Sequence, residues 1–269
     1  MQEGAPALAL DQITVTFIAD GAARFTAVRD ATLVVRPGEF VSVVGPTGCG
    51  KSTLLNIAAG LLAPSSGEVR VSGEPLDGLN RKAGYLFQSE ALLPWRTALD
   101  NVTVGLEFRG VPRAQAVARG ENWLARVGLR GHGHRYPHQL SGGMRKRVAL
   151  AQTLILDPQI ILMDEPFSAL DIQTRQLMEN ELLELWSADR KSVVFITHDL
   201  EEAISLSDRV VVLSAGPESR PIGEFEIDLP RPRDVAEIRL TPRFVELHSL
   251  IWGAMREEVL KSYARQQNK

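Results

Sequence analysis

The segment that runs from residue 41 to residue 62 restricts the fold of this chain more than any other part of its sequence. An apolar run, VSVV, is followed by GPTGCGKST and then by the helix-favouring run LLNIAAGLL. The pattern G-x-x-x-x-G-K-[ST] is met by Gly45, Gly50, Lys51 and Ser52. Glycines let backbone N–H groups curl around phosphate oxygens, and the start of the following helix adds partial positive charge. The segment therefore predicts a strand, a phosphate-binding loop and a helix, in that order.

The side chains of this loop indicate which ligand it binds. Lys51 offers a point charge to the β- and γ-phosphates, and the hydroxyl of Ser52 is suited to ligate Mg²⁺. ATP and Mg²⁺ are therefore the predicted cofactors. The nucleotide-binding residues predicted here are Gly45, Pro46, Thr47, Gly48, Cys49, Gly50, Lys51, Ser52 and Thr53. Cys49 is the only cysteine, no base is assigned to it, and we expect a bystander that can react with thiol reagents.

Short runs rich in Val, Ile and Leu predict strands that are covered on both faces, hence a parallel sheet between helices. These runs occupy residues 39–44, 159–163, 192–197 and 209–213. The earlier run ALDQITVTF alternates apolar and polar residues, which favours a half-exposed antiparallel strand in a small β layer beside the main core. The predicted fold class is α/β.

Between residues 90 and 149 strand-like runs give way to helical stretches such as PRAQAVARGENWLARVGL. We divide the chain into a domain at 1–235, with its core at 1–88 and 150–218 and an inserted helical subdomain at about 89–149, and a C-terminal helical extension at 236–269. The extension repeats apolar residues at helical spacing, which predicts a helix packed on its own domain or, alternatively, a helix that binds a partner. These residues are Phe244, Leu247, Ile251, Met255 and Val259.

Two carboxylates and a histidine follow two of the predicted strands. Asp164 and Glu165 end the run QIIILMDEP, and His198 follows VVFIT. Strand ends are where parallel sheets bind their ligands. Asp164 is suited to hold the hydrated Mg²⁺ beside Ser52, and Glu165 to orient or deprotonate the attacking water. His198 is then expected to contact the γ-phosphate or to hold the water, so ATP hydrolysis is the predicted reaction.

The run LSGGM at 140–144 precedes a helical stretch and predicts a second anion site. Ser141 resembles an N-cap, and Gly142 and Gly143 leave backbone N–H groups open, although an ordinary capped helix is the alternative. This site cannot easily serve the same phosphate from within one chain. The basic residues 145–147 behind it predict a solvated helix face.

Taken in order, GPTGCGKST, Gln88, LSGGM, ILMDEP, SALD and His198 resemble the ATP-binding cassette (ABC) ATPases across most of the chain. The resemblance implies a P-loop NTPase (RecA-like) core and a head-to-tail dimer, in which Ser141, Gly142 and Gly143 of one copy close over ATP held by residues 45–53 of the other. It also implies that Gln88 links the Mg²⁺ site to the helical subdomain and that Asp171 lies in the loop crossing the dimer.

The resemblance further makes Phe17 the expected adenine-stacking aromatic, with Phe25 as an alternative and core packing as the other role for either. One residue departs from the family pattern, because Met144 stands where the family usually has Gln. The expected contacts of this motif come from Ser141 and the backbone, so we expect activity to survive.

The segment LFQSEALLPWRTALDNVTVGL resembles importers of nitrate, sulfonates and taurine, with LLPWR and DNV carrying the likeness. The implied partners are transmembrane permease subunits and, indirectly, a solute-binding protein. Leu92, Pro94 and Trp95 are then expected to line a docking groove, unless Trp95 is buried in the helical subdomain.

The net charge of −3 argues against nucleic acid as a partner. Without an apolar run of ~20 residues or a signal-like start in MQEGAPALAL, we expect a peripheral protein at the cytoplasmic face of the cell membrane. The predicted function is the ATP-hydrolysing subunit of an ABC importer. The alternatives are a soluble ABC ATPase of DNA repair or translation, for which a second cassette or a coiled coil is missing, and a small-molecule kinase, which leaves LSGGM and SALD unexplained.

Overall fold

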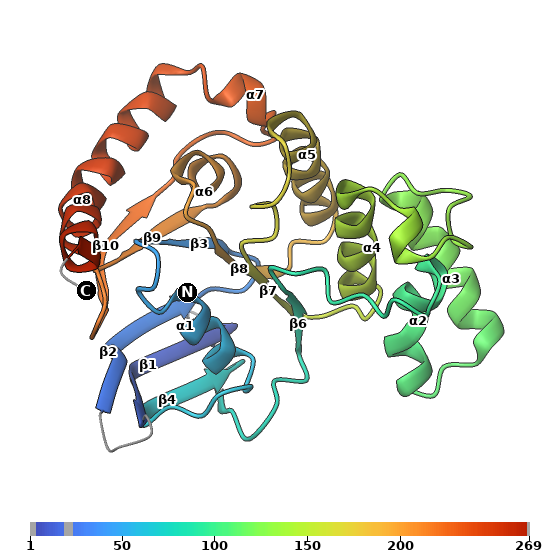
Figure 1. The fold of residues 1–269 in the computed structure, drawn as a ribbon, viewed down its shortest axis with the longest axis horizontal. Coiled ribbons are helices and arrows are strands. Elements are labelled where there is room, and N and C mark those ends of the chain that lie inside the picture. Colours follow the sequence, from blue (N-terminus) through green and yellow to red (C-terminus); the bar gives the residue numbers. More distant parts are fainter. Residues whose placement is uncertain (1–3, 19–23, 268–269) are drawn as a thin grey trace.

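A six-stranded sheet forms the centre of the protein. The computed structural model describes residues 4–18 and 24–267, and within them the strands of this sheet lie in the order β10-β9-β3-β8-β7-β6 (Figure 1). Five of these strands are parallel, and only β10 is antiparallel to its neighbour β9. The strands are β3 (Phe40–Val44), β6 (Ala83–Leu86), β7 (Ile160–Asp164), β8 (Ser192–Ile196), β9 (Arg209–Leu213) and β10 (Pro221–Glu226).

A second sheet, antiparallel throughout, covers one side of the protein in the order β2-β1-β4-β5. Its strands are β1 (Leu8–Ile18), β2 (Arg24–Val35), β4 (Ser66–Val71) and β5 (Glu74–Pro75). The pairing of β1 with β2 carries register shifts between residues 10 and 16, so the alternation expected along this strand is interrupted. Ile13 and Val15 are buried, whereas Phe17, near the end of β1, is 42% exposed.

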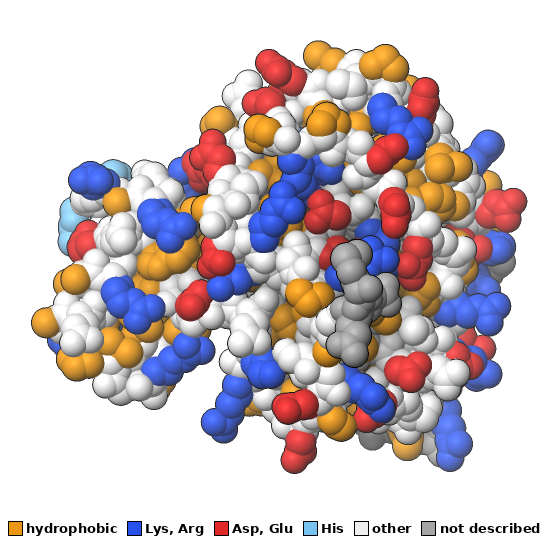
Figure 2. Space-filling model, turned by 180° about the vertical axis from the view of Figure 1, so that it is seen from behind, with side chains coloured by type: hydrophobic (Ala, Val, Ile, Leu, Met, Phe, Trp, Pro, Cys, Tyr) orange, Lys and Arg blue, Asp and Glu red, His pale blue; other side chains and the backbone are white. Residues whose placement is uncertain are grey.

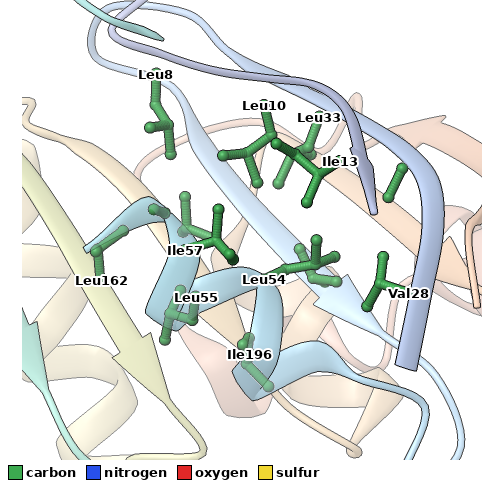
Figure 3. Close-up of a cluster of buried hydrophobic side chains, with 14 of the residues drawn as sticks. Leu8, Leu10, Ile13, Val28, Leu33, Leu54, Leu55, Ile57, Leu162 and Ile196 are labelled. Atoms are coloured by element: carbon green, nitrogen blue, oxygen red, sulfur yellow. The ribbon is translucent and has the colours of Figure 1, made fainter. Parts of the chain in front are cut away.

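Helix α1 (Lys51–Ala58) lies between the two sheets (Figure 1). Figure 3 shows how Leu54, Leu55 and Ile57 of α1 meet apolar side chains of both sheets. Alternate residues of the central strands, such as Val41 and Val43 of β3, point into this cluster because successive strand residues face opposite sides of a sheet. The packing fixes the start of α1, and with it the loop that joins β3 to α1.

The opposite face of the central sheet is covered by helices. The other set of strand residues, including Met163 and Phe195, packs against α4 and α5, while Val210 and Val212 pack against α6 and α8. The helices of this face are α4 (Gly142–Leu154), α5 (Ile172–Ala188), α6 (Leu200–Leu206), α7 (Val235–Ile238) and α8 (Pro242–Gln267). The apolar stripe predicted in α8 is buried on its own domain from Phe244 to Met255, with Val259 partly buried beside it.

Between β6 and α4 the described chain contains helices and no strands, as its sequence pattern predicts. The helices are α2 (Ala98–Phe108), α3 (Arg113–Arg126) and the short 3₁₀ helix η1 (Pro137–Gln139). They form a lobe that a notch separates from the rest of the molecule (Figure 2). In the described part of the chain, no helix is both long and apolar enough to span a bilayer.

The four predicted central strands all form, within a residue of their predicted ends, and the α/β class is confirmed. The structure adds the two edge strands of the central sheet, β6 and β10. The residues of β10 are partly buried or exposed, and its sequence lacks the apolar run that predicts a buried strand. Helix α4 runs without interruption across residue 149, the predicted end of the helical subdomain. The division into domains given above stays a prediction.

Candidate active site

The predicted phosphate loop joins the end of β3 to the start of α1. Gly50, the N-cap of α1, has φ +92°, a backbone conformation that disfavours any residue with a side chain. A Cβ atom at this position would also lie 2.7 Å from Cγ2 of Val28. The glycine is therefore required for the turn that brings the loop back over the helix start.

Lys51 lies inside the loop rather than in solvent. Its side chain is buried, and Nζ donates to the carbonyl oxygens of Gly45, at 2.9 Å, and Pro46, at 3.2 Å. These contacts hold a positive charge at the centre of the loop. An anion in the loop would meet that charge together with the N-terminal dipole of α1.

Asp164 faces Ser52 across the crevice, as the metal assignment requires. Oγ of Ser52 donates to Oδ1 of Asp164 at 3.0 Å. Burial and the neighbouring Glu165 raise the pKa of Asp164, against the opposing effect of Ser52 and Lys51. A bound cation would relieve this cost, because it compensates a carboxylate that burial disfavours. In the described residues no group of three or more His, Cys, Asp or Glu side chains is arranged to hold a metal ion.

Glu165 is the meeting point of the predicted catalytic side chains. Its Oε2 lies 3.1 Å from Nδ1 of His198 and accepts a hydrogen bond of 3.4 Å from Nε2 of Gln88. Its φ of +43° is unusual for a residue with a side chain, and its N–H donates to the carbonyl oxygen of Ile196 at 2.9 Å. Strain of this kind concentrates at functional sites, and here it turns Glu165 towards the next strand end.

A pocket of about 490 Å³ unites these groups with the loop. Phe17 and Phe25 are direct partners in the pairing of β1 with β2, and both exposed rings line the pocket. The remaining lining consists of Ala27, Thr47, Gly48, Gly50, Lys51, Ser52, Thr53, Gln88, Glu165 and His198. The two aromatic alternatives are therefore neighbours at one end of the site, and neither serves as core packing.

The LSGGM motif lies elsewhere. Ser141 caps α4 by accepting from the N–H of Met144 at 3.3 Å, and it is exposed. Among the described residues, those that line the pocket do not include Ser141, Gly142 or Gly143. Met144 packs partly against the apolar cluster of the helical lobe, which explains how an apolar residue fits at this position.

The run SALD is adjacent to the motif. Asp171 caps α5 by accepting from the N–H of Thr174 at 3.0 Å, and a Cβ on Gly143 would lie 2.8 Å from Cγ2 of Thr174. The starts of α4 and α5 therefore approach each other at the surface. Two of the predicted dimer contacts, the motif and Asp171, belong to one face.

Two expectations about single side chains are wrong. Cys49 is fully buried and burial raises the pKa of its thiol, so it lacks the exposed thiolate that thiol reagents need. Lys146 is 2% exposed rather than solvated, and its Nζ donates to the carbonyl oxygen of Gln88. The loop that carries Gln88 packs over α4, and this covering could not be read from a helical charge run.

The sequence pattern also missed Arg175. Its guanidinium donates to the carbonyl oxygen of Leu170 at 3.2 Å and to Oδ2 of Asp199 at 3.1 Å, and it lies 3.6 Å from Oε1 of the buried Glu202. This side chain ties the SALD turn to the turn that carries His198. A lone arginine in a helix gave no signal of that role.

Comparisons with known proteins agree with this geometry. Residues 28–168 match the family model described as ABC transporter. An uncharacterised ABC transporter ATP-binding protein of Methanocaldococcus jannaschii is 46% identical, over 95% of this chain and 93% of that protein. A taurine import ATP-binding protein of Pelagibacter ubique is 41% identical, over 87% of this chain and 90% of that protein.

A nitrate import ATP-binding protein of Synechococcus elongatus is 39% identical over 93% of this chain, which spans 38% of that longer protein. Among solved structures, a dimeric ATP-binding cassette bound to ADP and phosphate superimposes with a TM-score of 0.72. It is 33% identical, and the match covers 83% of this chain and 100% of that one.

The phosphate loop, the strand-end carboxylates and the histidine thus occur in a fold and a sequence that are shared with transporter ATPases. The chain belongs to the ABC transporter family, as an ATP-binding ATPase subunit of the branch that includes the taurine and nitrate importers.

Proposed function

We propose that two copies of this chain bind and hydrolyse ATP to power uptake of a small solute through separate permease subunits. The observation that carries the proposal is the convergence of Lys51, Ser52, Gln88, Glu165 and His198 on one pocket. Two exposed aromatic rings stand at the end of that pocket, where a nucleotide base would need a stacking surface.

Each residue of the pocket has a distinct chemical task in this proposal. Lys51 and the backbone of residues 45–53 hold the phosphates of ATP. Oxygen atoms of Ser52, Asp164 and Gln88 would ligate Mg²⁺, and the donor set fits because this ion prefers oxygen ligands. An Mg²⁺ ion held by these oxygen atoms would neutralise part of the phosphate charge.

In this proposal Glu165 takes a proton from the attacking water, and His198, whose Nδ1 lies 3.1 Å from Oε2 of Glu165, orients that carboxylate and would contact the γ-phosphate. The hydrogen bond from Gln88 to Glu165 gives the helical lobe a connection to the same carboxylate. The proposed reaction is therefore in-line attack of water on the terminal phosphate.

The partner that completes each site is a second copy of the chain, arranged head to tail. The exposed start of α4, with Ser141, Gly142 and Gly143, offers backbone N–H groups and a helix dipole to an anion. Within one copy it lies outside the pocket. The structurally similar cassette is a dimer bound to ADP and phosphate, which supports a second copy as the partner.

Glu165→Gln tests the hydrolytic assignment. The variant keeps the shape of the side chain but cannot accept a proton, so we expect ATP binding within about twofold of the parent and a kcat at least about 100-fold lower. Glu257→Gln, an exposed site on α8, is the matched control. Hydrolysis by Glu165→Gln at the parental rate would reject Glu165 as the base.

The permease is proposed to dock beside β6 and α2. A groove of about 260 Å³ lies there, lined among others by Phe87, Glu90, Ala91 and Gly105. Leu92, Pro94 and Trp95 follow Ala91 along the chain, and Trp95 is 72% exposed. An exposed Trp next to an apolar groove is typical of an interface anchor.

Co-purification with permease subunits expressed from the neighbouring genes tests this surface. Trp95→Ala should reduce recovery of the complex by about tenfold, whereas Trp252→Ala, which removes a partly exposed Trp from α8, should leave it unchanged. Equal recovery of both variants would place the permease on another surface.

The proposed solutes are nitrate, sulfonates or taurine, and a separate solute-binding protein delivers them. The relatives named as taurine and nitrate import proteins support this class. The chain would then lie at the cytoplasmic face of the cell membrane, bound through the permease. ATPase stimulation of the assembled transporter by each solute with its binding protein identifies which one is used.

A further inference from the structure

The last turns of α8 form hydrogen bonds to residues 215 and 216, in a segment that packs against the phosphate loop. Glu258 is buried, and its Oε2 accepts a hydrogen bond of 2.7 Å from the N–H of Ala215. About two helical turns further along α8, the guanidinium of Arg265 donates to the carbonyl oxygen of Gly216. Two side chains of the same helix therefore hold the backbone of two adjacent residues, Ala215 and Gly216.

The carboxylate of Glu258 is suited to this contact at neutral pH. Burial by itself favours the neutral acid, but the hydrogen bonds from Lys261 and from the Ala215 amide outweigh it and hold the pKa of Glu258 below its ordinary value. An ionised acceptor makes the stronger hydrogen bond to a backbone N–H.

The segment 215–219, which we call the backing segment, contacts the phosphate loop directly. A Cβ on Gly216 would lie 3.1 Å from the carbonyl oxygen of Gly48, so the two backbones are close. The buried hydroxyl of Ser219 donates to the carbonyl oxygen of Cys49. The backing segment also pairs with β2, since the N–H of Ser219 donates to the carbonyl oxygen of Ala27 at 3.1 Å.

These contacts affect the direction in which the backbone N–H groups of the phosphate loop point. In a trans peptide the C=O and the following N–H point in opposite directions. Because Ser219 holds the carbonyl of Cys49 towards the backing segment, the N–H of Gly50 points away from it, to the side of the loop where phosphates bind. A loop that is fixed in this orientation before binding loses less conformational freedom when ATP enters.

A small cavity shows that the end of α8 reaches the edge of the nucleotide site. It measures about 230 Å³ and is lined by Phe25, Thr47, Gly48, Gly216, Pro217, Ser262 and Arg265. Three of these residues, Phe25, Thr47 and Gly48, also line the proposed ATP pocket. The same residues therefore separate the end of α8 from the proposed ATP pocket.

We propose that Glu258 and Arg265 are positioning residues for ATP, which act through the backing segment to hold the phosphate loop in its binding conformation. This inference rests on the proposed nucleotide site at residues 45–53. It assigns to α8 a role in the affinity for nucleotide, beyond the apolar packing of its first turns.

The test compares ATP affinity and kcat in the full chain. Glu258→Ala and Arg265→Ala should each raise the Kd for MgATP, measured with a fluorescent ATP analogue and by competition with ATP, by about three- to tenfold. The kcat at saturating ATP should stay within about twofold, since Glu165 and His198 are not disturbed. Glu258→Gln keeps an acceptor oxygen for the Ala215 amide, so it should restore most of the affinity that Glu258→Ala loses.

Glu257→Ala and Arg256→Ala change exposed neighbours on the same helix and serve as matched controls. Thermal unfolding of every variant separates loss of fold from loss of affinity, and Arg265, which is exposed, keeps the test valid if Glu258→Ala unfolds. Parental affinity in a folded Arg265→Ala variant, or a fall in kcat with an unchanged Kd, would overturn the proposal. Lys51→Ala tests the proposed nucleotide site separately from the role of Glu258 and Arg265, because retained ATP affinity in that variant would reject the nucleotide site itself.

Discussion

The pocket around the phosphate loop and the start of α4 are both suited to bind anions, but they differ in how many side chains converge on them. At the pocket, side chains from four separate parts of the chain already contact one another, in the pairs Ser52–Asp164, Gln88–Glu165 and Glu165–His198. At the start of α4, Ser141 is exposed and its hydroxyl accepts a hydrogen bond from its own helix, while Gly142 and Gly143 are partly exposed. The difference indicates that one copy holds a nucleotide by itself and that the second region acts on a partner.

Lys51→Ala should have the largest effect, and it should affect only the pocket around the phosphate loop. Removing a buried charge that faces the phosphates is expected to weaken ATP binding by about 100-fold or more, on the order of 3 kcal/mol. Isothermal titration with MgATP measures it. Arg145→Ala, beside the second region, should leave the affinity of the isolated chain unchanged, and tight binding by Lys51→Ala would remove the basis for the comparison.

Ser141→Arg should separate the two regions most clearly. A bulky cation at the exposed cap blocks approach of a second copy to the pocket, so steady-state hydrolysis should fall by about 100-fold or more while the Kd of the single chain for ATP changes less than about twofold. Binding and turnover are measured on the same preparation. A parallel loss of both would mean that Ser141 supports the pocket of its own chain.

Phe17→Ala and Phe25→Ala sharpen the description of the pocket, with a smaller effect. Loss of a stacking ring is expected to raise the Kd for ATP by about three- to tenfold. We expect the larger rise for Phe17, and an ATP-to-GTP comparison shows whether the ring senses the base. If neither variant differs from the parent, the exposed rings at this end of the pocket have another purpose.

Glu179→Gln tests a carboxylate that lies outside both regions and should change stability alone. Glu179 is fully buried beside Arg239, and burial raises its pKa to about 8. Because the folded-state pKa lies above that of an unfolded glutamate, the folded chain binds the proton more tightly, and this contribution to stability is lost as pH rises through about 8.

The variant has no such titration, so its free energy of unfolding relative to the parent should increase between about pH 5 and pH 8.5, by about 1 kcal/mol or more. Chemical denaturation at several pH values measures it, with Glu257→Gln as the flat control. A difference that does not change with pH would mean that Glu179 is already ionised at low pH, held by Arg239.

The sequence predicted the parts of the molecule whose signals are local. The phosphate loop, the four buried strands and the apolar stripe of α8 each follow from spacing within one segment, and the structure has them all. Contacts between segments that are distant along the chain could not be predicted from the sequence pattern. Arg175 joins two turns that are 29 residues apart, from 170 to 199, and the position of Lys146 under Gln88 depends on how a loop covers a helix. The contact of Glu258 with the backing segment belongs to the same class.

The site itself was predictable as a set of residues, but its geometry was not. Asp164, Glu165 and His198 follow from their places at strand ends, whereas the hydrogen bond from Gln88 to Glu165 requires the tertiary fold. Phe17 and Phe25 could not be ranked from the sequence, and the reason is visible in the structure. They are paired residues of neighbouring strands, at the same end of the same pocket.

The most direct measurement of the central claim is the molar mass of Glu165→Gln in solution with and without MgATP, by light scattering after size-exclusion chromatography. Because this variant binds ATP without hydrolysing it, we predict a monomer of about 29.5 kDa without nucleotide and a dimer of twice that mass with ATP. Adding Ser141→Arg to the same chain should return the mass to that of the monomer while ATP binding persists. A variant that binds ATP and stays monomeric, or whose dimer tolerates Ser141→Arg, would contradict the account.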